Sequence, residues 1–185
     1  MLEASVILER GRCSWGKCYF CGWGKKTSDK SEKEILQKLE AVLERKKGVK
    51  LLKIFSSGSF LDDRQFPPSL RKKVFELAAR FGVEEVVVES RPEFVTERIV
   101  EELKSLPLRV TVAMGLEVAD DEALKLLNKG FTVKDYERAA KLLKSSGLGV
   151  RTYLLVNPHP ALSGIDAQRS LLDESIRFAL EHSDS

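Results

Sequence analysis

The chain has 185 residues, of which 43% are hydrophobic and 32% are charged, and its formal net charge is +3 at pH 7. This balance is typical of one globular domain with enough apolar residues for a core, and a mild positive charge neither requires nor excludes an anionic partner. No stretch approaches the ~18 uncharged apolar residues that a membrane helix needs, and the N-terminal MLEASVILER lacks a secretory signal pattern. We therefore expect a cytoplasmic protein without a membrane partner.

The first half of the chain alternates predicted strands with predicted helices. An apolar run at residues 5–8 is predicted to be a strand, and it leads into a loop that holds every cysteine of the chain. A capping box at Ser31 and Glu34 indicates the start of a helix. A second strand is predicted at 51–55, followed by the polar turn SSGS and a helix that begins near Pro68.

The second half continues the same alternation. Strands are predicted at 83–90, 108–115 and 149–156, and Thr96 and Thr132 are candidate N-caps for the helices between them. A short helix is also predicted over the segment DEALKLLN. The last helix is predicted over residues 165–182, with an apolar face made of Leu172, Ile176, Ala179 and Leu180.

Five strands, each followed by a helix, indicate an α/β protein with a parallel sheet and right-handed crossovers. Five units are too few for a closed eight-stranded barrel of ~250 residues. We therefore expect an open, partial βα barrel of five to six units, with a doubly wound sheet as the alternative. In both folds the loops after the carboxyl ends of the strands carry the chemistry, and the cysteine loop is one of them.

The three cysteines of the chain, Cys13, Cys18 and Cys21, lie within nine residues. Structural zinc requires four ligands, so a zinc site here needs a remote histidine such as His159. An iron–sulfur cluster held by three thiolates, with one iron left open for a small ligand, uses the cysteines as they stand. From Arg10 to Lys26 every charged side chain is basic, which describes either a solvated loop or a rim that attracts anions.

The loop RCSWGKCYFCG resembles the hallmark of the radical S-adenosylmethionine (SAM) superfamily, three cysteines spaced C-x3-C-x-aromatic-C after the first strand. The resemblance implies a 4Fe–4S cluster on Cys13, Cys18 and Cys21, and a SAM molecule that is cleaved reductively to a 5′-deoxyadenosyl radical. It also implies that Phe20 packs near the adenine. The first gap, SWGK, has four residues instead of three, and Gly16 can absorb the added residue by adopting a positive φ.

The turn after the second predicted strand occupies the place of the superfamily's glycine-rich motif. The resemblance implies that Ser57, Gly58 and Ser59 approach the amino group of SAM, although the glutamate that often ends that motif is absent here. Three further segments, ESRPE, GLEVADDEALKLLNKG and GVRTYLLVNPHP, resemble the radical-SAM domain of the elongator catalytic subunit and, more closely, the archaeal radical-SAM partner of archaeosine synthase. This similarity implies a reductant protein as partner, and tRNA or a tRNA-modifying protein as a further one.

Charged side chains occur on one face of the predicted strands, near their carboxyl ends. Buried charges are costly unless they are paired or bind a ligand. One interpretation pairs Glu89 or Glu117 with Arg91 or Arg151. The other, implied by the resemblance, has the glutamates accept hydrogen bonds from the SAM ribose while the arginines face its carboxylate, with Asn128 as a further SAM contact.

The sequence therefore predicts that residues 1–185 form a radical-SAM core domain that lacks its last βα unit and that acts as a radical-SAM enzyme. Two alternatives stay open: a non-catalytic, zinc-binding α/β module that recognises RNA through its basic loop, and a degenerate domain that binds a cluster without cleaving SAM. His159 is interpreted as an ordinary loop histidine, with a catalytic role as the alternative.

Overall fold

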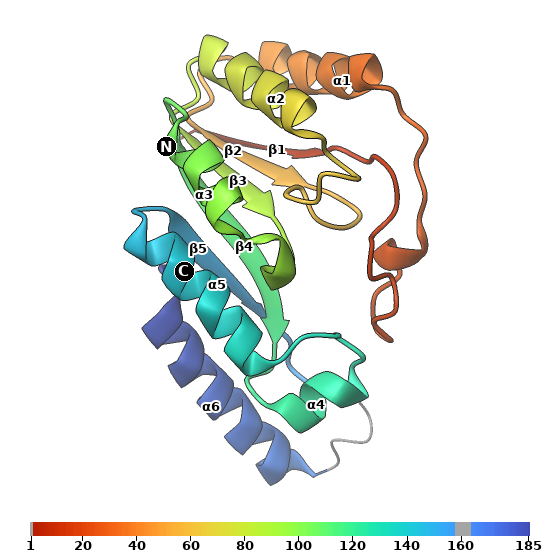
Figure 1. Ribbon diagram of the computed structural model, residues 1–185, viewed down its shortest axis with the longest axis vertical. Helices are drawn as coiled ribbons and strands as arrows, with labels where there is room; N and C mark the ends of the chain where they lie inside the picture. Colours follow the sequence, from red (N-terminus) through yellow and green to blue (C-terminus); the bar gives the residue numbers. More distant parts are fainter. Residues whose placement is uncertain (1, 158–163) are drawn as a thin grey trace.

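A computed structural model describes residues 2–157 and 164–185 of the chain (Figure 1). Its sheet has five strands in the order β1-β2-β3-β4-β5, and every neighbouring pair is parallel. The strands are β1 (Glu3–Ile7), β2 (Leu51–Phe55), β3 (Glu85–Glu89), β4 (Arg109–Glu117) and β5 (Gly149–Leu154). The order in space follows the order in sequence without the reversal of a doubly wound sheet, so the open, partial barrel is confirmed and the alternative is wrong.

Helices connect consecutive strands and cover one side of the curved sheet (Figure 1). The capping boxes predicted at Ser31 and Thr132 are both present, and the Thr96 hydroxyl accepts from the backbone N–H of Ile99. Two short 3₁₀ segments that the sequence did not reveal follow β1 and β3: η1 (Trp23–Lys25) and η2 (Pro92–Phe94). The helices are α1 (Glu32–Arg45), α2 (Pro68–Arg80), α3 (Glu97–Lys104), α4 (Asp121–Leu126), α5 (Val133–Ser145) and α6 (Ile165–His182).

The core lies between the sheet and these helices. One side chain in two along each strand points into it, as the alternation along a β-strand requires. Val86 and Val88 of β3 and Val110 and Val112 of β4 are all buried there. The described residues contain no helix that is both long and apolar enough to cross a membrane.

The predicted apolar face of α6 is only partly correct: Ala179 is buried and Leu172 is half-buried, but Ile176 and Leu180 are not. Leu180 is 76% exposed and Ile176 is 40% exposed, whereas Ser175, Ala179 and His182 are buried. Polar contacts orient the helix: the Ser175 hydroxyl accepts from the backbone N–H of Ala119, and the His182 Nε2 atom lies 3.5 Å from the Glu137 carboxylate of α5. The face with Leu171, Ser175, Phe178, Ala179 and His182 therefore docks against the domain, and Ile176 and Leu180 stay in solvent.

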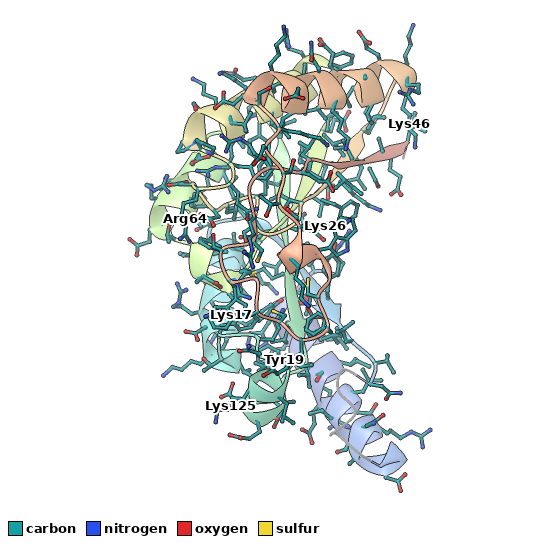
Figure 2. The ribbon with its side chains drawn as sticks, turned by 90° about the vertical axis from the view of Figure 1, so that its right-hand side faces the viewer. Lys17, Tyr19, Lys26, Lys46, Arg64 and Lys125 are labelled. Atoms are coloured by element: carbon teal, nitrogen blue, oxygen red, sulfur yellow. The ribbon has the colours of Figure 1, made fainter. Side chains whose placement is uncertain are left out.

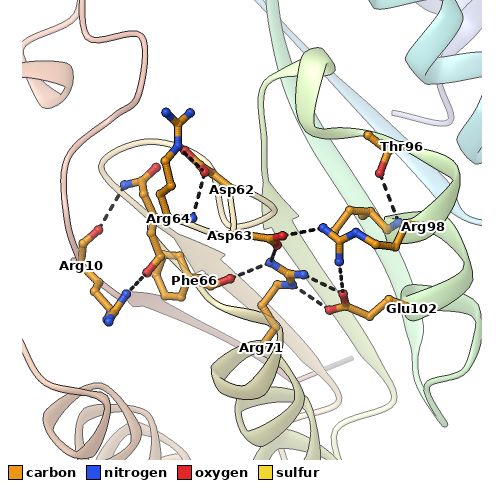
Figure 3. A network of polar contacts seen from close by, with 11 residues as sticks. Arg10, Asp62, Asp63, Arg64, Phe66, Arg71, Thr96, Arg98 and Glu102 are labelled. Atoms are coloured by element: carbon orange, nitrogen blue, oxygen red, sulfur yellow. Dashed lines mark hydrogen bonds and ion pairs between the residues drawn. The ribbon is translucent and has the colours of Figure 1, made fainter.

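The fully buried side chain of Arg71 joins α2 to α3 (Figure 3). Its guanidinium donates to both carboxylate oxygens of Glu102, at 2.7 and 2.6 Å, and to Asp63 at 2.8 Å. It also donates to the carbonyl oxygen of Phe66, at 2.6 Å. The loop that leaves β2 is thus fixed on α3 by one cation whose hydrogen-bonding groups are satisfied, which is the condition under which a buried charge is tolerated.

Replacing Glu102 by Gln should lower the free energy of unfolding by about 3 kcal/mol, because the Arg71 guanidinium then stays buried without its main counter-charge. Urea unfolding followed by circular dichroism measures this loss. The matched control is Glu101→Gln, which removes a 70% exposed carboxylate paired with Lys104 and should cost less than about 0.5 kcal/mol. Equal losses in the two variants would contradict the proposed importance of the buried pair.

Candidate functional site

A pocket of about 330 Å³ lies where the carboxyl ends of the strands meet the cysteine loop. All five strands or the turns that follow them contribute to its wall, as expected for a parallel barrel in which these ends gather on one side. The pocket is lined by Ile7, Cys13, Cys18, Phe20, Cys21, Trp23, Phe55, Ser56, Ser57, Gly58, Glu89, Ser90, Arg91, Ala113, Gly115, Glu117, Lys129 and Tyr153.

All three thiols are free, half-buried and part of this wall. Burial raises the pKa of the Cys18 thiol, against the opposing influence of the Lys129 and Arg91 charges. Within residues 2–157 and 164–185, no three His, Cys, Asp or Glu side chains are grouped closely enough to hold a single metal ion. His159 lies outside the described residues.

The cysteine loop is anchored on the connection between α4 and α5. The Trp15 indole N–H donates to the carbonyl oxygen of Asn128 at 2.7 Å, and the Asn128 side-chain amide donates to the carbonyl oxygen of Lys17 at 3.0 Å. Gly16 lies between these contacts with φ of 60°, a value that glycine adopts without strain. The extra residue of the four-residue gap is therefore accommodated in a loop whose two sides are both held by Asn128.

The turn after β2 presents unsatisfied polar groups to the pocket. Ser57 is 4% exposed, and in the described part of the chain its hydroxyl, like that of Ser56, has no hydrogen-bond partner. A buried hydroxyl without a partner is unusual in a folded protein, and one in a pocket wall is suited to a polar ligand. Gly58 lets this turn approach the thiols, because an added Cβ would lie 2.8 Å from the Cα of Cys13.

Ser59, by contrast, is occupied by the protein itself. Its backbone N–H donates to the Gln65 side chain at 2.8 Å, and its hydroxyl accepts from the backbone N–H of Arg91 at 3.1 Å. It is buried but is not part of the pocket wall. Of the predicted trio, Ser57 and Gly58 therefore line the pocket and Ser59 supports it.

The buried charges pair differently from the sequence-based interpretation. Glu117 contacts Lys129 at 3.1 Å, and neither Arg91 nor Arg151 is its partner. A shift in register between Gly115 and Glu117, with φ of 68° at Glu117, breaks the regular alternation of β4 at this point. Strand periodicity alone could not have identified Lys129, which belongs to the turn after α4.

Arg91 contacts three other parts of the site. Its guanidinium forms an ion pair with Glu93 at 2.5 Å and donates to the carbonyl oxygen of Lys129 at 2.7 Å. It also lies 4.0 Å from the Sγ atom of Cys18. The positive charge of Arg91 is thus directed at a thiol of the cysteine loop.

Arg151 does not line the pocket. Its Nε donates to the hydroxyl of Ser185 at 3.0 Å, beside a C-terminal segment in which the backbone N–H of Asp184 donates to the carbonyl oxygen of Val150. Tyr153 lines the pocket instead, because it lies two residues further toward the carboxyl end of β5. The alternation along the strand places Arg151 and Tyr153 on the same face. Because only the end of the strand reaches the pocket, the sequence could have identified Tyr153 as the lining residue.

Glu89 lies in the wall with its carboxylate 3.4 Å from the backbone nitrogen of Ser56. Burial raises its pKa to about 7, the Ser56 N–H opposes this shift, and the negative charge of Glu117 adds to it. The carboxyl is therefore available in both its neutral and its charged form near neutral pH. Together with the thiols, the free hydroxyls and the Lys129–Glu117 pair, it can hold a ligand that carries both hydroxyl and charged groups.

The stability of the protein without added iron should fall as the pH rises from about 4.5 to 7, because in this range the folded state holds a proton on Glu89 that the unfolded state has released. Glu89→Gln removes this dependence. When the pH is raised from about 5 to about 8, the free energy of unfolding of the variant, measured with urea, should increase by about 2 kcal/mol relative to that of the wild type. Exposed Glu101→Gln should follow the wild type at both values, and a Glu89→Gln gain that is independent of pH would contradict the assignment.

Three comparisons relate the chain to known proteins. A family model described as the radical SAM superfamily matches residues 11–160. Archaeosine synthase subunit beta of Thermococcus kodakarensis is 36% identical over 154 residues, which cover 76% of this chain and 46% of that protein. A tRNA uridine(34) acetyltransferase of Methanocaldococcus infernus is 31% identical over 87 residues, covering 47% of this chain and 16% of that protein.

Among solved structures, the archaeal Elp3 of Methanocaldococcus infernus with an N-terminal deletion (1–46) has the same fold, with a TM-score of 0.61 at 18% identity. The match covers 94% of this chain and 42% of that one. The chain thus spans about half the length of the archaeosine synthase subunit that it matches. Because the family model extends over most of its residues, from the cysteine loop past β5, the chain belongs to the radical SAM superfamily.

Proposed function

We propose that Cys13, Cys18 and Cys21 hold a 4Fe–4S cluster and that the pocket beside them binds SAM. The observation that supports this proposal is that all three thiols and two buried, unpartnered hydroxyls line one pocket in a member of the radical SAM superfamily. When bound and reduced by an external protein, the cluster supplies the electron that cleaves SAM to a 5′-deoxyadenosyl radical. Residues 1–185 are proposed to act as one core domain.

The residues of the wall have complementary roles in this proposal. The Ser57 hydroxyl and the turn at Gly58 meet the polar end of SAM. Phe20, whose ring centre lies 5.5 Å from the Lys129 ammonium, packs against the adenine of SAM. Glu89 and Glu117 accept hydrogen bonds from the ribose hydroxyls. Their burial beside the pocket keeps water from competing for these contacts.

Arg91 has a different proposed role from the SAM-carboxylate contact expected at first. Its guanidinium is already engaged by Glu93 and by the carbonyl oxygen of Lys129. The remaining direction is toward the sulfur of Cys18. We therefore assign Arg91 to stabilising the negative charge of the cysteine loop, since a cation at this distance favours a thiolate over a thiol.

The proposed reaction is a radical step in tRNA modification, carried out together with a partner protein. The basis is the naming of the two relatives, one as a subunit of archaeosine synthase and the other as a tRNA uridine(34) acetyltransferase. A separate reductant protein is proposed to supply the electron for this step. In the alternative, a zinc-binding RNA module, the thiols hold zinc in place of an iron–sulfur cluster.

Anaerobic reconstitution with iron and sulfide tests the proposal. The wild type should turn brown and form 5′-deoxyadenosine from SAM after reduction with dithionite, whereas Cys18→Ala should lose both the absorbance and the product. The Ser145→Ala variant, changed on an exposed part of α5, is the control and should match the wild type. A colourless protein with one zinc per chain would contradict the proposal, and a stable cluster without product would identify a domain that cannot cleave SAM.

Ser57→Ala should weaken SAM binding by about 5- to 10-fold without changing the iron content, because one hydrogen bond to the ligand is lost while the thiols are untouched. Equilibrium binding of SAM to the reconstituted protein measures the change, with Ser145→Ala as the matched control. An unchanged SAM affinity at full iron content would remove Ser57 from the binding site.

A further inference from the structure

The exposed aromatic rings of the described residues are confined to one short segment. Tyr19 is 71% exposed, Trp23 45% and Phe20 41%, while every other Phe, Tyr and Trp ring is buried or half-buried. The chain has fourteen such residues, from nine Phe, three Tyr and two Trp, so this grouping is far from an even distribution. A contiguous set of exposed rings is characteristic of a surface that binds a partner.

The same segment is basic throughout. Its charged residues from Arg10 to Lys26 are all Arg or Lys, so it attracts anions along its whole length. Two lysines lie over aromatic rings: Lys26 Nζ is 4.0 Å from the ring centre of Trp23, and Lys17 Nζ is 5.1 Å from that of Trp15. Figure 2 shows Lys17, Tyr19 and Lys26 along the loop that faces the viewer.

The rings also lie at the entrance to the pocket. Trp23 and Phe20 belong to the pocket wall and are at the same time exposed, so a ligand that reaches the pocket passes beside them. Tyr19 continues this surface toward α4, where its backbone N–H donates to the carbonyl oxygen of Leu127. A substrate that fits this arrangement has a flat ring to stack and negative charges close to that ring.

We propose that Lys17, Tyr19, Trp23, Lys25 and Lys26, here called the loop platform, bind an unpaired nucleotide of an RNA strand. The base stacks on the exposed rings, and the lysines contact the phosphates on either side. An unpaired nucleotide is required because bases within a duplex present no free face to an aromatic side chain. The inference rests on the proposed function, to which it adds the form of the substrate and the residues that hold it.

Fluorescence anisotropy with a labelled single-stranded RNA oligonucleotide tests the platform, using both the iron-free and the reconstituted protein. Trp23→Ala should weaken binding about 10-fold or more, and Trp23→Phe should restore most of the affinity because it keeps a stacking ring. The double variant Lys25→Ala/Lys26→Ala should weaken binding and reduce its dependence on salt concentration, since fewer counterions are released. Lys72→Ala, on the exposed face of α2, is the control and should bind as the wild type does.

The proposal would be overturned by single-stranded RNA that fails to bind, or by RNA that binds the Trp23→Ala variant as tightly as the wild type. Equal affinity for a fully paired duplex of the same sequence would also overturn it, because binding would then depend on charge without stacking. Formation of 5′-deoxyadenosine is measured in parallel. If SAM is cleaved but RNA binding does not require the platform, the RNA-binding proposal is wrong and the proposed function stands. If RNA binding requires the platform but SAM is not cleaved, the RNA-binding proposal stands and the proposed function is wrong.

Discussion

The contacts of Arg91 connect the parts of the site that the sheet alone does not bring together. The residue follows β3, its backbone N–H reaches the turn after β2, and its side chain reaches the turn after α4 and the sulfur of Cys18. Parallel strands deliver these turns to one side of the domain, but the turns still need a common partner to set their distances. A planar guanidinium with five donors can satisfy several such partners at once.

Much of the fold follows from local signals in the sequence. Apolar runs predicted all five strands to within a few residues, and the capping boxes at Ser31 and Thr132 marked the helix starts, because these patterns depend only on neighbouring residues. The face of α6 was not predictable in this way. Its apolar residues Ile176 and Leu180 extend the helical stripe of Leu172 and Ala179 but are exposed, and the docked face is set by the contacts of Ser175 and His182 with distant segments.

The candidate site shows the same division. The thiols, Ser57, Glu89 and Arg91 all lie at or after strand ends and could be identified from chain order, and the structure brings them to one pocket. Lys129 as the partner of Glu117 depends on a register shift in β4, and Asn128 as the anchor of the cysteine loop depends on a contact between residues 111 positions apart. Neither leaves a periodic trace in the sequence. Tyr153 could have been predicted from the sequence, because it shares a face with Arg151 and lies closer to the strand end.

The anchoring of the cysteine loop by Asn128 has a consequence for how the site is made. Each strand pairs only with its neighbours in sequence, so the βα units can form in turn as the chain leaves the ribosome. The thiols are synthesised first, whereas the residues that hold Trp15 and Lys17 in place arrive more than a hundred positions later. The loop therefore lacks these two contacts until the fourth strand and α4 have been built, and its thiols take up their final positions only after that point.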